Sequence, residues 1–502
     1  MSSISQIKYG AIISYIAIGI NIVTGLLYTP WMIHSIGKGY FGLYTLAMSV
    51  ISLFVFDFGL SSAVTRFVAK YLAEGKPEQA NNCLGLVYKL YIYIDIILIV
   101  VLSSVYFFIP SIYQELTPDE IEKFKIVYII AAVFSIISFP FIPVTGILTA
   151  HEKFIQLKGC DLFHKLFIVI TMTCCLLMGY GLYALVSVNA IAGLIVIVLK
   201  LWIIHRNTTT HINFKYKNSS ELREILGYSG WTTLIAVSQR FIFNIAPSIL
   251  GIMSGSESIA ILGIAITLEG YTFTFANAIN GLFLPKVSRI ISHDDRGILP
   301  LMIRVGRIQI LIIGLLVIGF ISLGHEFIYL WVGQAFEETY LCAILLILPS
   351  FFHLPQEIAA TTIIATNKVK LQAFVFMFMA LLNIILAFSL AHLYGALGIA
   401  ISICIAYIVR TIGMDIIYYK KLNIDILTFF KASFGQLALP LFETFIIGLI
   451  ISIYLPVNGW IGFILKGGLL VSIYSIIMIY QGMNTEEKSL IRSLIPKLNR
   501  NE

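Results

Sequence analysis

The chain has 502 residues, of which 59% are hydrophobic and only 12% are charged, and its mean hydropathy is +0.93. Soluble domains carry about 25% charged residues, so this composition excludes an ordinary soluble protein and indicates a membrane protein. The net charge of +7 does not indicate nucleic-acid binding, because the lysines and arginines cluster in short segments between apolar runs, as orientation signals do. The six cysteines show neither metal-site nor redox spacing.

Long continuous apolar runs, without alternation of polar residues, select helices rather than barrel strands. A helix needs about 20 apolar residues to cross the hydrocarbon core. We therefore predict an all-α membrane protein with about fourteen transmembrane helices. They are expected near residues 8–34, 40–68, 83–109, 124–150, 159–179, 181–205, 223–253, 259–287, 301–324, 339–365, 371–392, 395–419, 431–455 and 461–480.

The charge of the connecting segments alternates along the chain. Basic residues follow every second helix, for example at Lys70, Arg206 and Lys421, whereas the other connections are acidic or nearly free of cations. Since positively charged loops stay in the cytoplasm, we predict that both termini are cytoplasmic. An even number of helices agrees with this.

Two helix pairs in the two halves of the chain have the same layout. Pro30 and Pro247 lie near the outer ends of the first and seventh helices, and a short Gly/Ser-containing turn follows each, at 37–39 and 255–258. The starts of the two pairs are six spans apart, an even number, so the pairs have the same orientation, which is typical of parallel repeats around a central cavity. We predict three parts: a six-helix lobe at 1–205, a second at 206–419, and two extra helices with a basic cytoplasmic tail at 420–502.

The segment between Pro30 and Arg66 carries a distinctive pattern. It reads P-W-x-x-x-x-I-G-K-G-Y-F-G-L-Y at 30–44 and D-F-G-L-S-S-A-V-T-R at 57–66. This resembles the polysaccharide transporters of the multidrug/oligosaccharidyl-lipid/polysaccharide (MOP) exporter superfamily, with the nearest likeness to Wzx-type flippases. Asp57, Gly59 and Arg66 are the positions that match the pattern.

The resemblance implies two six-helix lobes around a central cavity that opens by alternating access, in the bacterial cytoplasmic (inner) membrane. The implied substrate is an undecaprenyl-diphosphate-linked oligosaccharide, moved from the cytoplasmic to the outer leaflet for assembly of surface polysaccharide such as O-antigen or capsule. The implied partners are this polyprenyl-diphosphate-linked glycan, membrane lipids and other polysaccharide assembly proteins.

Two charged residues are predicted near the bilayer midplane. At 1.5 Å per residue, Arg240 lies about seventeen residues, or roughly 25 Å, from one end of its helix, and Glu269 lies about ten from the end of the next. Each charge costs at least roughly 2.5–3.5 kcal/mol at that depth. Either Arg240 binds the diphosphate or an acidic sugar through its paired donors, or Arg240 and Glu269 form a permanent pair. Polar neighbours at helical spacing extend the candidate substrate-binding stripe, namely Asn244, Asn277 and Asn280.

Other ionisable residues within the spans are further candidates. Cations nearer the cytoplasmic end could attract the anionic head group, although long side chains also reach the interface for purely structural reasons. These cations are Arg66, Lys89, Lys165 and Arg410. Asp95 and His353 are candidates for a coupling Na⁺ or H⁺, and the membrane potential is the alternative energy source; neither a metal site nor a cofactor is expected.

Three functions are compatible with a chain of this class. A flippase of lipid-linked oligosaccharide agrees best with the several cations among the intramembrane residues. A cation-coupled multidrug antiporter of the same fold is the alternative, and it should favour acids facing a cationic drug. A membrane enzyme usually needs a large outer loop or a cluster of catalytic residues, and the sequence shows neither, so we expect a protein that is not an enzyme.

Overall fold

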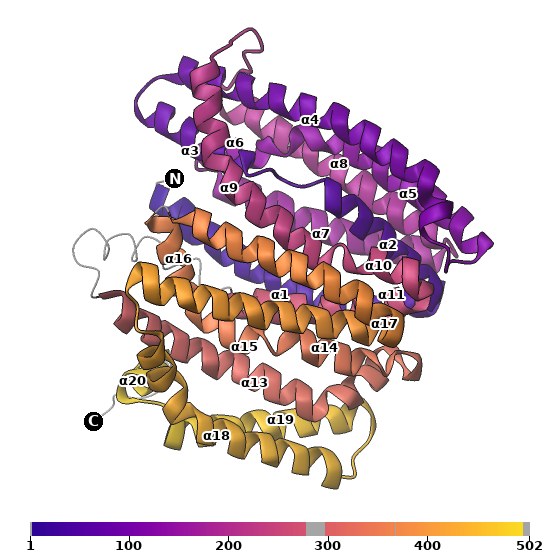
Figure 1. Cartoon of the computed structure of the whole chain (residues 1–502), viewed down its shortest axis with the longest axis vertical. Helices are drawn as coiled ribbons and strands as arrows, with labels where there is room; N and C mark the ends of the chain where they lie inside the picture. Colours follow the sequence, from indigo (N-terminus) through magenta and orange to yellow (C-terminus); the bar gives the residue numbers. More distant parts are fainter. Residues whose placement is uncertain (1–2, 278–296, 367, 495–502) are drawn as a thin grey trace, which may run out of the picture. The chain divides into compact units, whose positions relative to one another are not determined.

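The computed structural model describes residues 3–277, 297–366 and 368–494 (Figure 1). Every regular element in these ranges is a helix, which confirms the predicted all-α class. The helices are α1 (Ser3–Ile36), α2 (Lys38–Phe54), α3 (Leu60–Ala73), α4 (Pro77–Ile112), α5 (Pro118–Ser138), α6 (Pro143–Ala150), α7 (Phe154–Leu177), α8 (Leu182–Asn207), α9 (Ser219–Phe243), α10 (Ala246–Met253), α11 (Gly255–Asn277), α13 (Ile298–Val332), α14 (Thr339–Ile347), α15 (Ser350–His353), α16 (Glu357–Ala365), α17 (Val369–Leu422), α18 (Ile426–Tyr454), α19 (Gly459–Ile477) and α20 (Thr485–Leu494), with short 3₁₀ or π turns η1 (Phe139–Phe141), η4 (Gln334–Phe336), η5 (Leu354–Gln356) and η6 (Met478–Gly482).

Eleven stretches of the described chain are long and apolar enough to cross a membrane. One of them, α17, has 54 residues and holds two helices joined at Gly395, whose φ of 54° is not helical. Helix α1 and the α2–α3 pair complete a count of about fourteen, as predicted.

Several predicted spans are interrupted helices rather than continuous ones. Pro247 follows the break between α9 and α10, and Pro349 and Pro355 divide the predicted span 339–365 into short pieces. Proline lacks the N–H group that continues a helix. The break in the predicted span 40–68 has another cause: the chain leaves the helix at residues 55–59, and Gly59 takes the left-handed conformation (φ 71°) that glycine adopts without strain.

The described chain forms two compact units, each built from two segments: unit 1 contains 1–263 and 376–403, and unit 2 contains 264–375 and 404–502. In unit 1, α3 packs on α4 and α6, while α5 packs on α2 and α8. Leu60, Val64, Tyr91 and Phe139 are almost completely buried in its core. The predicted lobe boundaries stay a prediction.

In unit 2, α13 packs along α18 and α19, and the three helices lie side by side in Figure 1. Gly314 allows this close approach, since a Cβ atom there would lie 2.6 Å from the Leu441 side chain. An ion pair between Lys466 of α19 and Glu326 of α13 (2.8 Å) adds a polar link, and the Lys466 side chain is only 5% exposed.

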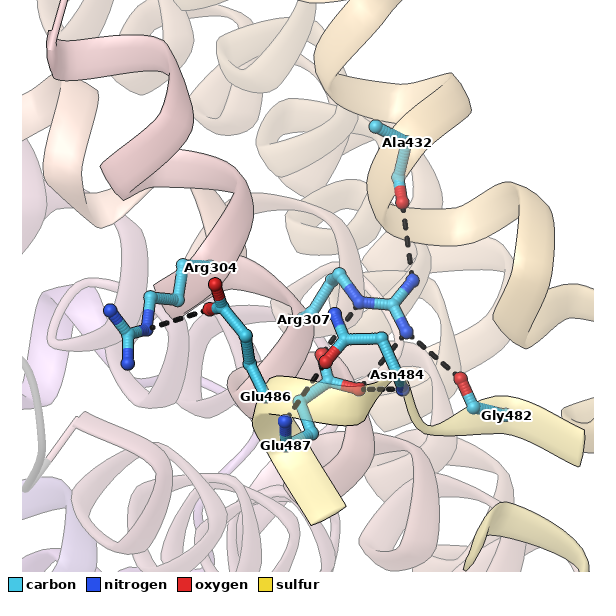
Figure 2. A network of polar contacts seen from close by, with 7 residues as sticks. All are labelled: Arg304, Arg307, Ala432, Gly482, Asn484, Glu486 and Glu487. Carbon is cyan, nitrogen blue, oxygen red and sulfur yellow. Dashed lines mark hydrogen bonds and ion pairs between the residues drawn. The ribbon is translucent and has the colours of Figure 1, made fainter. Parts of the chain in front are cut away.

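A second polar link joins α13 to the start of α20, a helix that was expected only as a basic tail (Figure 2). Arg307 donates from Nε and Nη2 to the two carboxylate oxygens of Glu487, at 2.6 and 3.0 Å. Its guanidinium also donates to the carbonyl oxygens of Gly482 (2.8 Å) and Ala432 (3.2 Å). Asn484 and Glu487 cap α20 reciprocally, each side chain accepting from the other's backbone N–H. The network therefore fixes α20 to both α13 and α18.

Candidate substrate site

The break between α2 and α3 places Asp57 outside regular helix. Its Oδ1 atom accepts a hydrogen bond from the Ser61 backbone N–H (3.1 Å), which caps the first turn of α3. The same oxygen accepts a hydrogen bond from the hydroxyl of Tyr91 on α4 (2.9 Å). Asp57 is half-buried and both of its partners lie in unit 1. The acid is therefore held in a defined position at the break.

Helix α9 crosses the break between α2 and α3. Two of its side chains donate hydrogen bonds to backbone carbonyl groups at the break. The Thr233 hydroxyl donates to the carbonyl oxygen of Phe58, and Arg240 Nη1 donates to that of Ser52 at 3.3 Å. The Arg240 guanidinium also lies over the ring of Phe56, 5.9 Å from its centroid. Irregular backbone at membrane depth occurs where it is buried in protein or lines a cavity. We call Ser52, Asp57, Arg240 and the ring of Phe56 the break site.

The second break of unit 1 begins one turn beyond Arg240, at Asn244, which ends α9. The nearby carbonyl oxygen of Phe241 accepts a hydrogen bond from the Asn383 side chain (3.3 Å). Asn383 in turn accepts one from the Ser402 hydroxyl (3.1 Å), and both of these side chains are buried. Two interrupted helices thus meet near Arg240 with polar partners for their freed backbone groups.

Unit 2 holds another group of intramembrane polar residues. Arg410 lies close enough to His353 and Glu357 to act on both electrostatically. The His353 ring packs against that of Tyr407, with centroids 5.6 Å apart, and its Nδ1 lies 3.0 Å from the Pro349 carbonyl oxygen. Glu269 also lies near Tyr407. His353, Arg410 and Glu269, which the sequence singled out separately, therefore share one neighbourhood.

The remaining candidates have other surroundings. Lys89 donates to the carbonyl oxygen of Tyr216 (2.6 Å), and Arg66 and Lys165 are exposed. One carboxylate oxygen of Asp95 is buried and has no hydrogen-bond partner among the described residues.

Asn280 lies outside the described residues, and so does the side chain of Asn277. Arg240 belongs to unit 1 and Glu269 to unit 2, so their pairing stays a prediction.

Sequence reasoning missed several members of these groups. Glu357 and Asp415, which lies beside Gln356, are acids within predicted spans, so the rule that selected Asp95 could have found them. Tyr91 and Thr233 carried no such signal, because a hydroxyl group in an apolar helix is common. Only the fold brings them to the break.

Comparisons with solved structures show which known fold this chain has. The chain is similar to the lipid II flippase MurJ in an inward closed conformation, with a TM-score of 0.71 at 15% identity, over 97% of this chain and 99% of that one. It is also similar to an inward-facing multidrug resistance MATE family transporter of the MOP superfamily (TM-score 0.64, 14% identity, 82% and 96% covered). A MOP superfamily transporter from Pyrococcus furiosus, described as having a binding pocket of reverse polarity, gives a TM-score of 0.57 at 14% identity, with 81% and 94% covered. The chain therefore has the fold that these flippases and transporters share, with several helices long enough to cross a membrane.

The family follows from the sequence itself. The model of the polysaccharide biosynthesis protein family matches residues 7–291, more than half of the chain, so the chain belongs to this family. No curated protein matches the chain by sequence. The resemblance to a polysaccharide family is thus confirmed, and the solved structures with this fold include members of the MOP superfamily.

Proposed function

We propose that this protein is a flippase that moves a polyprenyl-diphosphate-linked oligosaccharide from the cytoplasmic to the outer leaflet of a bacterial inner membrane. The observation that carries the proposal is Arg240, a cation inside unit 1 beside two interrupted helices. The polysaccharide biosynthesis family membership supports a glycan substrate. The MurJ-like fold supports handling of a lipid-linked one.

Arg240 has the chemistry that a diphosphate requires. A guanidinium offers five N–H donors in a planar fork that matches phosphate oxygens in pairs. The bond to Ser52 occupies one donor and anchors the group at the break, and Phe56 supports one face of the plane. The remaining donors would bind the head group. Asp57 would keep the break in place.

The mechanism that we propose is alternating access, in which the head group passes through a polar cavity while the polyprenyl tail stays in lipid. The chain makes and breaks no covalent bond in this scheme. A coupling Na⁺ or H⁺, with Asp95 and His353 as candidates, or the membrane potential would supply the energy. Both termini would face the cytoplasm. Other polysaccharide assembly proteins would deliver the substrate on that side, and the exported glycan would be used to build O-antigen or capsule.

One observation favours the alternative, a cation-coupled multidrug antiporter. The polar group in unit 2 contains the carboxylates Glu269, Glu357 and Asp415 around Arg410. An excess of acid suits a cationic drug or a coupling cation. The flippase remains our proposal because the family is that of polysaccharide biosynthesis.

Deletion of the gene separates the two functions. For a flippase, the deletion strain should lose surface glycan and accumulate the lipid-linked oligosaccharide in inverted membrane vesicles, where a glycosidase added from outside reaches only the cytoplasmic leaflet. Ethidium retention should not change. Normal surface glycan with increased ethidium retention would contradict the flippase and support the antiporter.

A further inference from the structure

Two turns that hold equivalent places in the predicted repeat contact each other within unit 1. The first, the Gly-Lys-Gly turn at 37–39, joins α1 to the first turn of α2, and the second, at 254–258, joins α10 to the first turn of α11. Lys38 Nζ lies 3.2 Å from the Glu257 carboxylate. The Ser256 hydroxyl donates to the carboxylate of Glu120, at the start of α5. Because the basic segments mark the cytoplasmic side, both turns are predicted to lie at the outer face of the membrane.

Backbone atoms also come very close here. At Gly42, a Cβ atom would lie 2.0 Å from the carbonyl oxygen of Ser256, a distance at which the backbone itself must move. At Gly39, a Cβ atom would lie 3.3 Å from the Ser256 hydroxyl and 3.5 Å from the Glu120 carboxylate. Residue 42 is therefore compatible with this contact only as glycine.

Further bonds hold the second turn in place. The Ser254 hydroxyl donates to the carbonyl oxygen of Ala391 (3.3 Å), just before the bend of α17 at Gly395. Glu120 also completes a capping box with Thr117 at the start of α5. One carboxylate therefore both caps its own helix and binds the second turn. These polar contacts are partly exposed, with 73% of the Glu257 side chain accessible, so water can replace them when the turns separate.

From this geometry, we propose that the two repeat turns form an outer latch, closed in this structure, and that Gly42 permits its closure. This inference rests on the proposed function, since export to the outer leaflet requires the predicted outer end to open. The latch is composed of Lys38, Gly42, Glu120, Ser256 and Glu257. Its separation would break one ion pair and one hydrogen bond to a carboxylate, and rehydrate the groups that made them.

A disulfide tests the closed contact directly. Gly39→Cys and Ser256→Cys, in a chain whose six native cysteines are replaced by serine or alanine, would place two sulfur atoms within bonding reach. We expect the disulfide to form readily in membranes on mild oxidation, measured as loss of labelling by a maleimide-polyethylene glycol reagent. Absence of the disulfide under conditions that oxidise a control pair would overturn the proposal.

Substitution of Gly42 tests whether this residue permits closure of the latch, and the readout, disulfide formation, does not depend on the identity of the substrate. In the cysteine pair background, Gly42→Ala should reduce the rate of disulfide formation at least fivefold. Gly19→Ala, where a Cβ atom meets nothing within 4 Å, is the matched control and should leave the rate unchanged. An unchanged rate in Gly42→Ala would overturn the proposed role. Should Gly42→Ala not accumulate, Lys38→Glu should slow the disulfide and the added Glu257→Lys should restore its rate.

The export measurement separates the latch from the proposed function. The oxidised cysteine pair should block surface glycan, and a reductant should restore it to the level of the cysteine-free parent. Full export by the oxidised protein would show that the turns need not separate, which overturns the latch. If surface glycan were independent of the gene altogether, the proposed function would fail, whereas the disulfide and its response at Gly42 would still decide closure.

Discussion

Arg240 in unit 1 and Arg307 in unit 2 are both arginines within apolar helices, but their partners differ. Arg307 is 3% exposed and binds both oxygens of Glu487 as well as two carbonyl groups. Among the described residues of unit 1, Arg240 has one hydrogen bond, to a carbonyl oxygen at 3.3 Å, and one aromatic neighbour. The charge of Arg307 is neutralised within the fold, whereas the described part of unit 1 provides no carboxylate bonded to Arg240.

This difference separates a structural cation from a candidate for binding. A buried charge is tolerated when it is paired and its hydrogen bonds are made. Arg307 satisfies both conditions, so it has little capacity left for a ligand. Within the described part of unit 1, Arg240 has donors left over, as the proposed diphosphate site requires.

The largest effect is expected at Glu487. Glu487→Ala would leave the buried Arg307 without its counter-ion, which should cost roughly 3–5 kcal/mol of stability. The measurement is the thermal unfolding temperature of the purified protein in detergent. Glu486→Ala is the matched control, since its pair with Arg304 is exposed and 3.5 Å long, and it should change stability by less than about 1 kcal/mol. Equal effects of the two substitutions would contradict the role assigned to Arg307. Arg307→Met combined with Glu487→Leu should recover most of the loss.

Arg240→Ala should impair export rather than folding. Loss of charge-assisted hydrogen bonds to the diphosphate, worth about 1.5–3 kcal/mol each, predicts a fall in the export rate of about tenfold or more. Arg240→Lys keeps the charge but not the paired donors, so it should retain part of the activity. Surface glycan, measured against protein level, is the readout.

Arg223→Ala, an exposed arginine on the same helix, is the control for Arg240 and should export normally. Full export by both Arg240 variants would remove this residue from the site. The difference between Arg240 and Arg307 would then not distinguish a binding arginine from a structural one.

Lys466 is a second buried cation of unit 2, paired with Glu326, and its substitution tests whether this cation also has a structural role. Lys466→Met leaves the Glu326 carboxylate, 21% exposed, without its charged partner, which should cost about 1–3 kcal/mol in thermal unfolding. The cost should be smaller than at Glu487 because water still reaches Glu326. Lys466→Met combined with Glu326→Gln should recover part of it. A drop in export with unchanged stability would contradict a purely structural role.

The smallest effect is expected at Asp57, which caps α3. Asp57→Asn keeps an acceptor for the Ser61 N–H and should be nearly neutral, whereas Asp57→Ala should cost about 1 kcal/mol. Thermal unfolding of both variants, together with Tyr91→Phe, measures this. Loss of export in Asp57→Asn at normal stability would show that the negative charge of Asp57 itself takes part in transport, in addition to its role in holding the break.

Composition and periodicity were sufficient for the general architecture. Long apolar runs have few structures open to them in a membrane, because backbone groups need internal hydrogen bonds there. The helical class, about fourteen spans and the charged residues inside them could therefore be predicted. The residue pattern at 30–44 and 57–66 was likewise sufficient to indicate the family to which the chain belongs.

Tertiary structure decided how those residues are used. Asp57 and Arg240 are 183 positions apart, and nothing local indicates that α9 crosses the break between α2 and α3. Arg307 falls within the predicted helix at 301–324, and nothing near it in the sequence indicates that Glu487, 180 residues away, makes it the buried partner of α20. A sequence shows that a charge stands in an apolar run and therefore needs compensation. Whether a carboxylate, a carbonyl group or a substrate provides it depends on contacts between distant segments, which local composition does not encode.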